Sequence, residues 1–303
     1  MGRTQGDTPP DPLVGRLESL ARESPELGEA AAVYGAVLPL LRDAEIGATV
    51  PAFTPEEACG RLGQGLHLLQ GLDLGVDADA AHDLALRLAR ALEAVRPTAS
   101  VRRLREALER GDPHARELLP HVAGGEREAV FEAARERGLD PNLLWTLSHA
   151  SLRPAFRAWC RALAPLAEGI PWRQAFCFVC GAPAAIGELR VDGGRHLRCG
   201  QCGASWQVRR LQCPWCGNED HTTLRTLYEE GRRATCRVEA CDRCRRYLKV
   251  VAAAVPTPPE ALVLVDLSTI RLDRVARERG YEAGRSRRPP RFLRGGRPGV
   301  TIA

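Results

Sequence analysis

The sequence predicts an α+β protein in which a helical N-terminal domain precedes small cysteine-rich modules and a C-terminal helix. Three observations lead to this prediction. Apolar residues recur at helical spacing from about residue 13 to 168, cysteine pairs and glycines dominate residues 171–250, and an apolar segment follows a group of prolines near residue 256. A chain of 303 residues is long enough for about two domains, each with its own core.

We expect four segments along the chain. Residues 1–12 are polar and proline-bearing, which predicts a flexible N-terminus, and residues 13–170 form an all-helical domain. The composition changes at Gly169-Ile170-Pro171. Residues 171–284 then form a double metal-binding module with a closing helix, and residues 285–303 form a disordered basic tail.

The helical segment carries recognisable start signals and apolar stripes. Thr54-Pro55-Glu56-Glu57 has the elements of a capping box with proline at the first helical position. The stripes are Cys59, Leu62, Leu66 and Leu69; Leu84, Leu88, Leu92 and Val95; Val101, Leu104 and Leu108; and Leu152, Phe156, Trp159, Leu163 and Leu166. Cys59 is therefore expected to be a small core residue, and Cys160 to pack beside its stripe. After the prolines, Ser268 is expected to cap a final helix that ends near Gly280.

Four Cys-x-x-Cys pairs follow one another within the second half of the chain. We predict that all eight thiols are metal ligands: Cys177, Cys180, Cys199, Cys202, Cys213, Cys216, Cys241 and Cys244. A two-residue gap lets both sulfurs of a tight turn face one ion, and a second pair completes a tetrahedral shell. The spacing thus predicts two closed four-cysteine sites, and small strands such as 206–209 between them would depend on the metal for stability.

Glycine follows three of the four pairs, at Gly181, Gly203 and Gly217. This pattern is typical of the knuckles in rubredoxin-like and zinc-ribbon sites, where the chain turns through a left-handed conformation. The fourth pair is followed by Arg245, so its turn should be more strained or differently shaped. Sequential pairing of the motifs is favoured because it closes short loops, while a cross-braced arrangement stays open.

Metal ions in such closed sites mainly have a structural role. A closed four-thiolate shell has no open coordination position, and thiolates suit both zinc and iron, so the metal stays open between the two. Four clustered pairs argue against dithiol exchange of the thioredoxin type. Cys236 is expected not to be a ligand, and His196 and His221 are not needed to complete either site.

Composition restricts the compartment and the partners. The longest apolar run, residues 30–41, is too short to cross a bilayer, and we expect no membrane insertion. Eleven cysteines without an apolar secretion signal indicate a cytoplasmic protein. The whole chain has a net charge of +5, and residues 285–303 contribute six arginines and no acidic residue, so the preceding residues have a net charge of −1. Residues 171–250 contain fourteen basic and eight acidic residues, a net charge of +6. Two metal ions, each held by four thiolates with a total charge of −2 per site, lower this to about +2. Nucleic acid is therefore an unlikely partner.

The cysteine motifs closely resemble those of the formate dehydrogenase accessory protein family, FdhE. The similar segments are residues 177–183, 197–206, 209–217, 239–249, 265–273 and 280–281, within a match of roughly 150–282. The resemblance implies a cytoplasmic maturation factor that associates with the catalytic subunit of a formate dehydrogenase. It also implies rubredoxin-type iron, or zinc, in the two four-cysteine sites.

We therefore expect a non-catalytic assembly factor that binds the immature catalytic subunit through a surface shaped by metal, and a homodimer is one oligomeric state left open. Two alternatives stay open. One is a nucleic-acid-binding zinc ribbon that uses Arg209, Arg210, Arg245 and Arg246, with Trp206, Trp215 and Tyr247 stacking on bases. The other is an iron-dependent redox protein.

Overall fold

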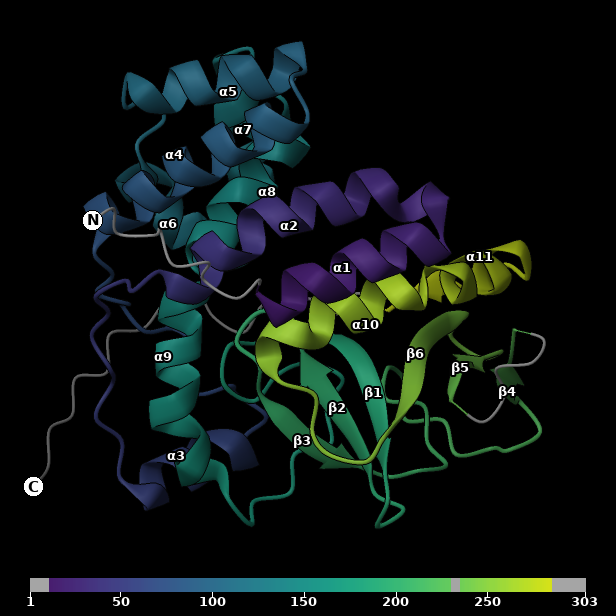
Figure 1. Ribbon diagram of the computed structural model, residues 1–303. Coiled ribbons are helices and arrows are strands. Elements are labelled where there is room, and N and C mark those ends of the chain that lie inside the picture. Colours follow the sequence, from purple (N-terminus) through teal and green to yellow (C-terminus); the bar gives the residue numbers. More distant parts are fainter. Residues whose placement is uncertain (1–10, 230–234, 285–303) are drawn as a thin grey trace, which may run out of the picture.

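The computed structural model describes residues 11–229 and 235–284, and within them helices precede a single sheet (Figure 1). This mixed architecture confirms the predicted fold class. The expected flexible segment 1–12 lies almost wholly, and the tail 285–303 entirely, outside the described residues. The helices before the sheet are α1 Pro12–Glu23, α2 Gly28–Asp43, α3 Pro55–Gly63, α4 Ala78–Val95, α5 Ala99–Glu109, α6 Ala115–Ala123, α7 Arg127–Glu136, α8 Pro141–Ser151 and α9 Arg153–Leu163.

The start of α3 is as predicted, but its end is not. Thr54 accepts a hydrogen bond from the Glu57 amide, and the Glu57 carboxylate accepts one from the Thr54 amide, so the capping box is confirmed. The helix stops at Gly63, before the rest of the predicted stripe, and Gly65 takes a φ of +76°. The prediction that Cys59 is a core residue is wrong, because Cys59 is exposed. Glycine weakens a helix, and three glycines at 60, 63 and 65 shorten this one.

The strands form one sheet in the order β3-β2-β1-β6-β5-β4, with β7 added beside β6. Their bounds are β1 Ala184–Arg190, β2 Arg195–Cys199, β3 Ser205–Val208, β4 Leu224–Leu227, β5 Cys236–Cys241, β6 Arg246–Ala253 and β7 Glu282–Ala283. Strand β3 confirms the strand predicted near Trp206. The order reveals a repeated unit: β1–β3 and β4–β6 are each antiparallel triplets, and each has one cysteine pair before its first strand and one before its third.

The two units join edge to edge through a parallel pairing. β1 pairs with β6, Gly187 lying opposite Val250, so the first strand of one unit meets the last strand of the other. An ion pair of 2.8 Å between the buried Arg195 on β2 and the partly buried Glu239 on β5 crosses the same junction. The two small triplets thereby become one sheet with fewer free edges.

The chain returns over this sheet after β6. Helices α10 Leu262–Ser268 and α11 Ile270–Glu278 cross one face of it, beneath α1 and α2 (Figure 1). The prediction for Ser268 is wrong: Ser268 ends α10, its hydroxyl donates to the Val265 carbonyl, and Thr269 occupies the N-cap of α11. The second helix ends close to Gly280, as predicted.

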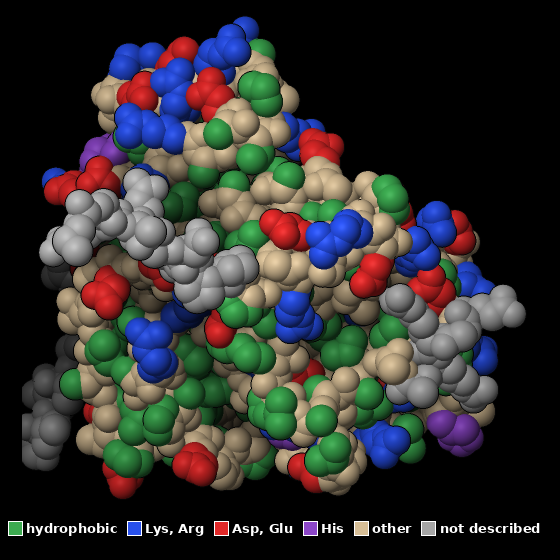
Figure 2. Space-filling view, in the orientation of Figure 1, with side chains coloured by type: hydrophobic (Ala, Val, Ile, Leu, Met, Phe, Trp, Pro, Cys, Tyr) green, Lys and Arg blue, Asp and Glu red, His purple; other side chains and the backbone are tan. Residues whose placement is uncertain are grey.

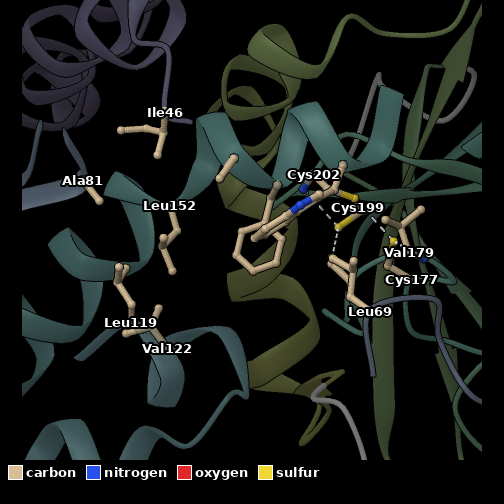
Figure 3. Close-up of a cluster of buried hydrophobic side chains, with 14 of the residues drawn as sticks. Ile46, Leu69, Ala81, Leu119, Val122, Leu152, Cys177, Val179, Cys199 and Cys202 are labelled. Carbon is tan, nitrogen blue, oxygen red and sulfur yellow. Dashed lines mark hydrogen bonds between the residues drawn. The ribbon is translucent and has the colours of Figure 1, made fainter. Parts of the chain in front are cut away.

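The main core extends from the helices into the first unit of the sheet. Leu88, Trp159, Cys199 and Val250 belong to one continuous cluster of buried side chains. Figure 3 shows the sulfurs of Cys177, Cys199 and Cys202 close to Leu69 and Val179, with Leu152 deeper on the helical side. The division of the chain at residue 170 stays a prediction, and this core runs across it. No helix in the described ranges has the length and apolar character needed to span a bilayer.

Candidate metal centres

Four turns of nearly the same shape present the cysteines. In each, the residue after the second cysteine donates its N–H to the carbonyl of the first cysteine, at 2.8–3.1 Å. The glycines at these positions have φ of +74°, +83° and +72°, as the glycine pattern predicts. In the fourth turn Arg245 takes the same left-handed conformation with φ of 57°. The turn therefore keeps its shape despite lacking glycine, and the strain expected of it lies in the backbone of Arg245.

Contacts of the Arg245 side chain offset that strain. Its guanidinium lies 4.1 Å from the ring centroid of Tyr281 and donates to the Arg279 carbonyl at 2.6 Å. Asp242, between the two cysteines, faces the same guanidinium at 3.4 Å. The segment that follows α11 thus fixes the one knuckle that has no glycine.

The structure brings the eight cysteines together as two groups of four, through the sequential pairing that the sequence favours. The groups are Cys177, Cys180, Cys199 and Cys202, and Cys213, Cys216, Cys241 and Cys244, with the sulfurs of each group within 4.8 Å of one another. The shortest approaches across pairs are 3.5 Å in the first group and 3.7 Å in the second. Tetrahedral sulfurs about 2.3 Å from an ion lie about 3.8 Å apart. Each group could therefore hold one metal ion.

Hydrogen-bond donors point at the sulfurs in both groups. The Val179 amide donates to Cys177 Sγ at 3.3 Å, and the Cys202 amide donates to Cys199 Sγ at 3.4 Å. In the second group the Asn218 side chain donates to Cys241 Sγ at 3.5 Å. Such donors orient metal-binding thiolates and stabilise their charge. Sequence reasoning missed Asn218, since its only signal is its place two residues after a knuckle.

Without an ion, the crowded thiols compete for protons. Burial raises the pKa of the Cys177 thiol well above its ordinary value, whereas hydrogen bonds from Cys177, Cys180 and Cys202 hold the pKa of Cys199 well below it. Burial also raises the pKa of Cys213, and it raises that of Cys244 to about 11. Loading an ion therefore has to release protons from these thiols, as expected for a closed thiolate site.

The two groups differ in exposure. All four cysteines of the first are buried, while Cys216 and Cys244 of the second are partly exposed.

Cys236 lies outside both groups, at the start of β5. Cys160 packs at the edge of the main core from α9, close enough to Cys202 to affect its pKa. That a metal is bound by the eight cysteines stays a prediction, and the choice between iron and zinc stays open.

Most of the residues that would have to contact nucleic acid, under the alternative hypothesis, are buried or contact other residues of the protein. Trp206 and Tyr247 are buried and cannot stack on bases. Arg209 pairs with Glu219 at 2.6 Å, and Arg245 contacts Tyr281 as described. On the face shown in Figure 2, acidic and basic side chains are interspersed over the upper helices. These observations weaken the nucleic-acid hypothesis without testing it.

Fold and site together define a class: a helical bundle joined to a sheet that carries two four-cysteine knuckle groups. A model of the family described as "FdhE, C-terminal domain" matches residues 211–288. The chain is 24% identical to a "Protein FdhE homolog" of Aquifex aeolicus over 57% of this chain and 62% of that protein. It is 30% identical to "Protein FdhE" of Escherichia coli O127:H6 over 36% of this chain and 35% of that protein.

The fold agrees with a crystal structure of the FdhE protein from Pseudomonas aeruginosa, with a TM-score of 0.61 at 23% identity over 91% of this chain and 92% of that one. The matched segments span less than two thirds of the curated relatives' length. The chain is thus similar to FdhE proteins in sequence and in fold, in agreement with the family that the cysteine motifs resemble.

Proposed function

We propose that this protein is a cytoplasmic accessory factor for a formate dehydrogenase, and that it binds the catalytic subunit during assembly without catalysing a reaction itself. The observation that carries the proposal is the match of the FdhE C-terminal domain to residues 211–288, which contain the whole second group of cysteines. The cysteine motifs of the first group resemble the same family.

The metal would act through the shape of the protein. Each ion would hold two successive turns together, so that the three short strands of each unit keep one arrangement. Four thiolates fill a tetrahedral shell, which supports a structural role over a catalytic one. Bound iron would add the capacity to change oxidation state, and this is the origin of the redox alternative.

Copurification of the full chain with the catalytic subunit tests the proposal. We expect the untagged subunit to be retained by the tagged chain from cells grown with formate, together with two metal ions per chain by elemental analysis. Cys241→Ala should lower both the retained subunit and the metal content, because it breaks the second group. Cys59→Ala is the matched control: Cys59 is exposed on α3, so both quantities should stay at the wild-type level. No retention of the subunit by the metal-loaded wild-type chain would contradict the proposal.

A further inference from the structure

A small cavity lies on the face of the second sheet unit that α11 does not cover. Val238 and Tyr247 of this unit pack against α11. Because side chains alternate along a strand, Arg237 and Glu239 on β5 face the other way, where they line the cavity. Its volume is about 200 Å³, and residues 210–215, which lead into the second cysteine group, form another part of its wall.

The wall formed by residues 210–215 is fixed to the sheet by Arg195. The buried guanidinium of Arg195 donates hydrogen bonds to the carbonyls of Arg209 at 3.2 Å and Gln212 at 2.8 Å. The same guanidinium pairs with Glu239 at 2.8 Å. The two walls of the cavity are thus tied together by contacts within the protein, so a ligand would meet a preformed site.

Positive side chains dominate the lining of this cavity. The described part of the chain contributes one carboxylate to it, that of Glu239, and five guanidinium groups, which belong to Arg195, Arg210, Arg225, Arg237 and Arg246. These six groups have a net charge of +4. Cys213 and Cys241 also line the cavity, and their group carries −2 when it holds a divalent ion. The lining therefore keeps a net charge of about +2 even beside a loaded metal site.

Charged residues just outside the lining leave this excess unchanged. Asp242 pairs with Arg225 at 2.6 Å, but the same carboxylate also faces Arg245 at 3.4 Å. Asp242 and Arg245 both lie outside the lining, and their two charges cancel.

Several guanidinium N–H groups of the cavity are free and can be reached from solvent. Arg210 is exposed and forms no hydrogen bond or ion pair with another residue of the described ranges. Arg225 is also exposed and donates to Asp242 through Nε alone. Arg237, which is partly exposed, donates to Glu239 through Nε and Nη2, so its Nη1 stays available. The cavity therefore offers accessible donors together with its positive charge.

The donors and the charge fit a phosphate group. Guanidinium groups bind phosphate and carboxylate oxygens in paired hydrogen bonds. The lining arginines come from β2, β4, β5, β6 and residues 210–215, so they approach the cavity from several sides. A tetrahedral oxyanion has oxygens in four directions, whereas a carboxylate has two in one plane. A phosphate ester carries about −1.5 to −2 at pH 7, which matches the charge of the lining.

We propose that this cavity binds a phosphate group, either as free inorganic phosphate or as the ester of a small molecule. Arg210, Arg225 and Arg237 would donate to its oxygens, and Arg195 would keep the walls in place. The cavity is smaller than the roughly 300–1,000 Å³ of sites for drug-sized molecules, so the rest of an ester would extend out of it. The inference goes beyond the proposed function, and its test requires no dehydrogenase subunit.

Fluorine NMR of the full, metal-loaded chain tests the cavity. The five tryptophans are labelled as 5-fluorotryptophan, and Trp215→Phe assigns the signal of Trp215, which lines the cavity. Inorganic phosphate and acetate are titrated separately at constant ionic strength, so that general screening is the same in both. We expect phosphate to shift the Trp215 signal to saturation, with about tenfold higher affinity than acetate, as for one additional charge-assisted hydrogen bond. No saturating shift, or equal affinity for the two anions, would overturn the inference.

Two neighbouring arginines provide a variant and its matched control. Arg210→Gln should weaken phosphate binding about tenfold, and the protein should stay folded because Arg210 has no partner among the described residues. Arg209→Gln removes the same charge from an exposed residue that pairs with Glu219 and lies outside the lining, so it should bind phosphate like wild type. Unchanged binding by Arg210→Gln would overturn the inference. Equal weakening in both variants would also overturn it, because it would indicate general attraction to a basic surface.

AMP and adenosine distinguish the two sources of the phosphate group. Tighter binding of AMP than of inorganic phosphate, with no shift caused by adenosine, would identify a phosphate ester as the ligand. Tighter binding of inorganic phosphate would identify the free anion. Adenosine that binds as tightly as AMP would mean that the phosphate group is not recognised, and this result would overturn the inference.

Discussion

Glu188 is a buried carboxylate whose partners fix the first unit of the sheet. Its side chain has no exposed surface and contacts Arg198 at 2.7 Å and Arg190 at 3.3 Å. It also accepts a hydrogen bond from the Thr257 amide at 3.0 Å, which ties the segment after β6 to β1. A buried charge is tolerated only when it is paired, so these contacts depend on one another.

Glu188→Ala should lower the free energy of unfolding by about 3–5 kcal/mol, because Arg198 would stay buried without a carboxylate. Denaturant unfolding in excess metal measures the change. The control is Glu219→Ala, which removes the exposed ion pair between Glu219 and Arg209. This variant should lose only about 0–1 kcal/mol of unfolding free energy. Equal losses in the two variants would show that burial does not determine the strength of the pair.

His67 links the helical half to the first cysteine group and should make stability depend on pH. Its Nδ1 lies 3.2 Å from the Val179 carbonyl oxygen, and burial lowers its pKa from 6.5 to about 4. Between about pH 4 and pH 6.5, His67 therefore binds a proton in the unfolded chain but not in the folded protein. Stability contributed by the neutral form is therefore present above about pH 6.5 and is lost as the pH falls towards 4.

His67→Gln should remove this part of the pH dependence, which is at most about 1.4 kcal/mol per pH unit. Unfolding curves of metal-loaded protein between pH 7 and 5 give the change of unfolding free energy per pH unit for wild type and for the variant. Proton uptake by the thiols contributes equally to both slopes and cancels when one is subtracted from the other. The exposed His221→Gln controls for loss of an imidazole. The same slope in wild type and His67→Gln would refute the assignment.

At the scale of elements, the knuckle turns were the most predictable part of the molecule. The Cys-x-x-Cys-Gly pattern predicts a tight turn, the left-handed residue and the pairing of neighbouring motifs, because all three depend on nearby residues. The parallel contact of β1 with β6 could not be predicted this way, since residues 187 and 250 carry no signal for each other.

The knuckle glycines should differ in their tolerance of a side chain. A Cβ on Gly203 would lie 2.6 Å from Pro259, whereas one on Gly217 would meet nothing within 4 Å. Gly217→Ala should therefore cost only the left-handed strain of about 1–2 kcal/mol, and Gly203→Ala should cost more. Unfolding free energy and the rate of metal loss to a chelator measure both effects. A larger effect at Gly217 would contradict the role given to Pro259.

At the scale of the whole molecule, the two cysteine groups are unequal. The first lies in the main core, and the amides of Leu68 and Leu69 donate to the Phe178 and Val179 carbonyls at 2.8 and 3.0 Å. The second lies outside the main core, with two of its four cysteines partly exposed. The helical half therefore depends on the first group for packing, a coupling that cysteine spacing alone could not predict.

This inequality predicts different consequences when each group is broken. In Cys177→Ala, amide hydrogen exchange should rise in the first unit of the sheet and also in residues 66–70 and α9, because their core contacts include this group. In Cys213→Ala, faster exchange should be concentrated in β4 and β5, which belong to the second unit. Exchange measured by mass spectrometry at equal metal supply resolves these segments. Unchanged protection of residues 66–70 and α9 in Cys177→Ala would mean that the helical half folds independently of the first group, and would place the boundary at residue 170 between two autonomous domains.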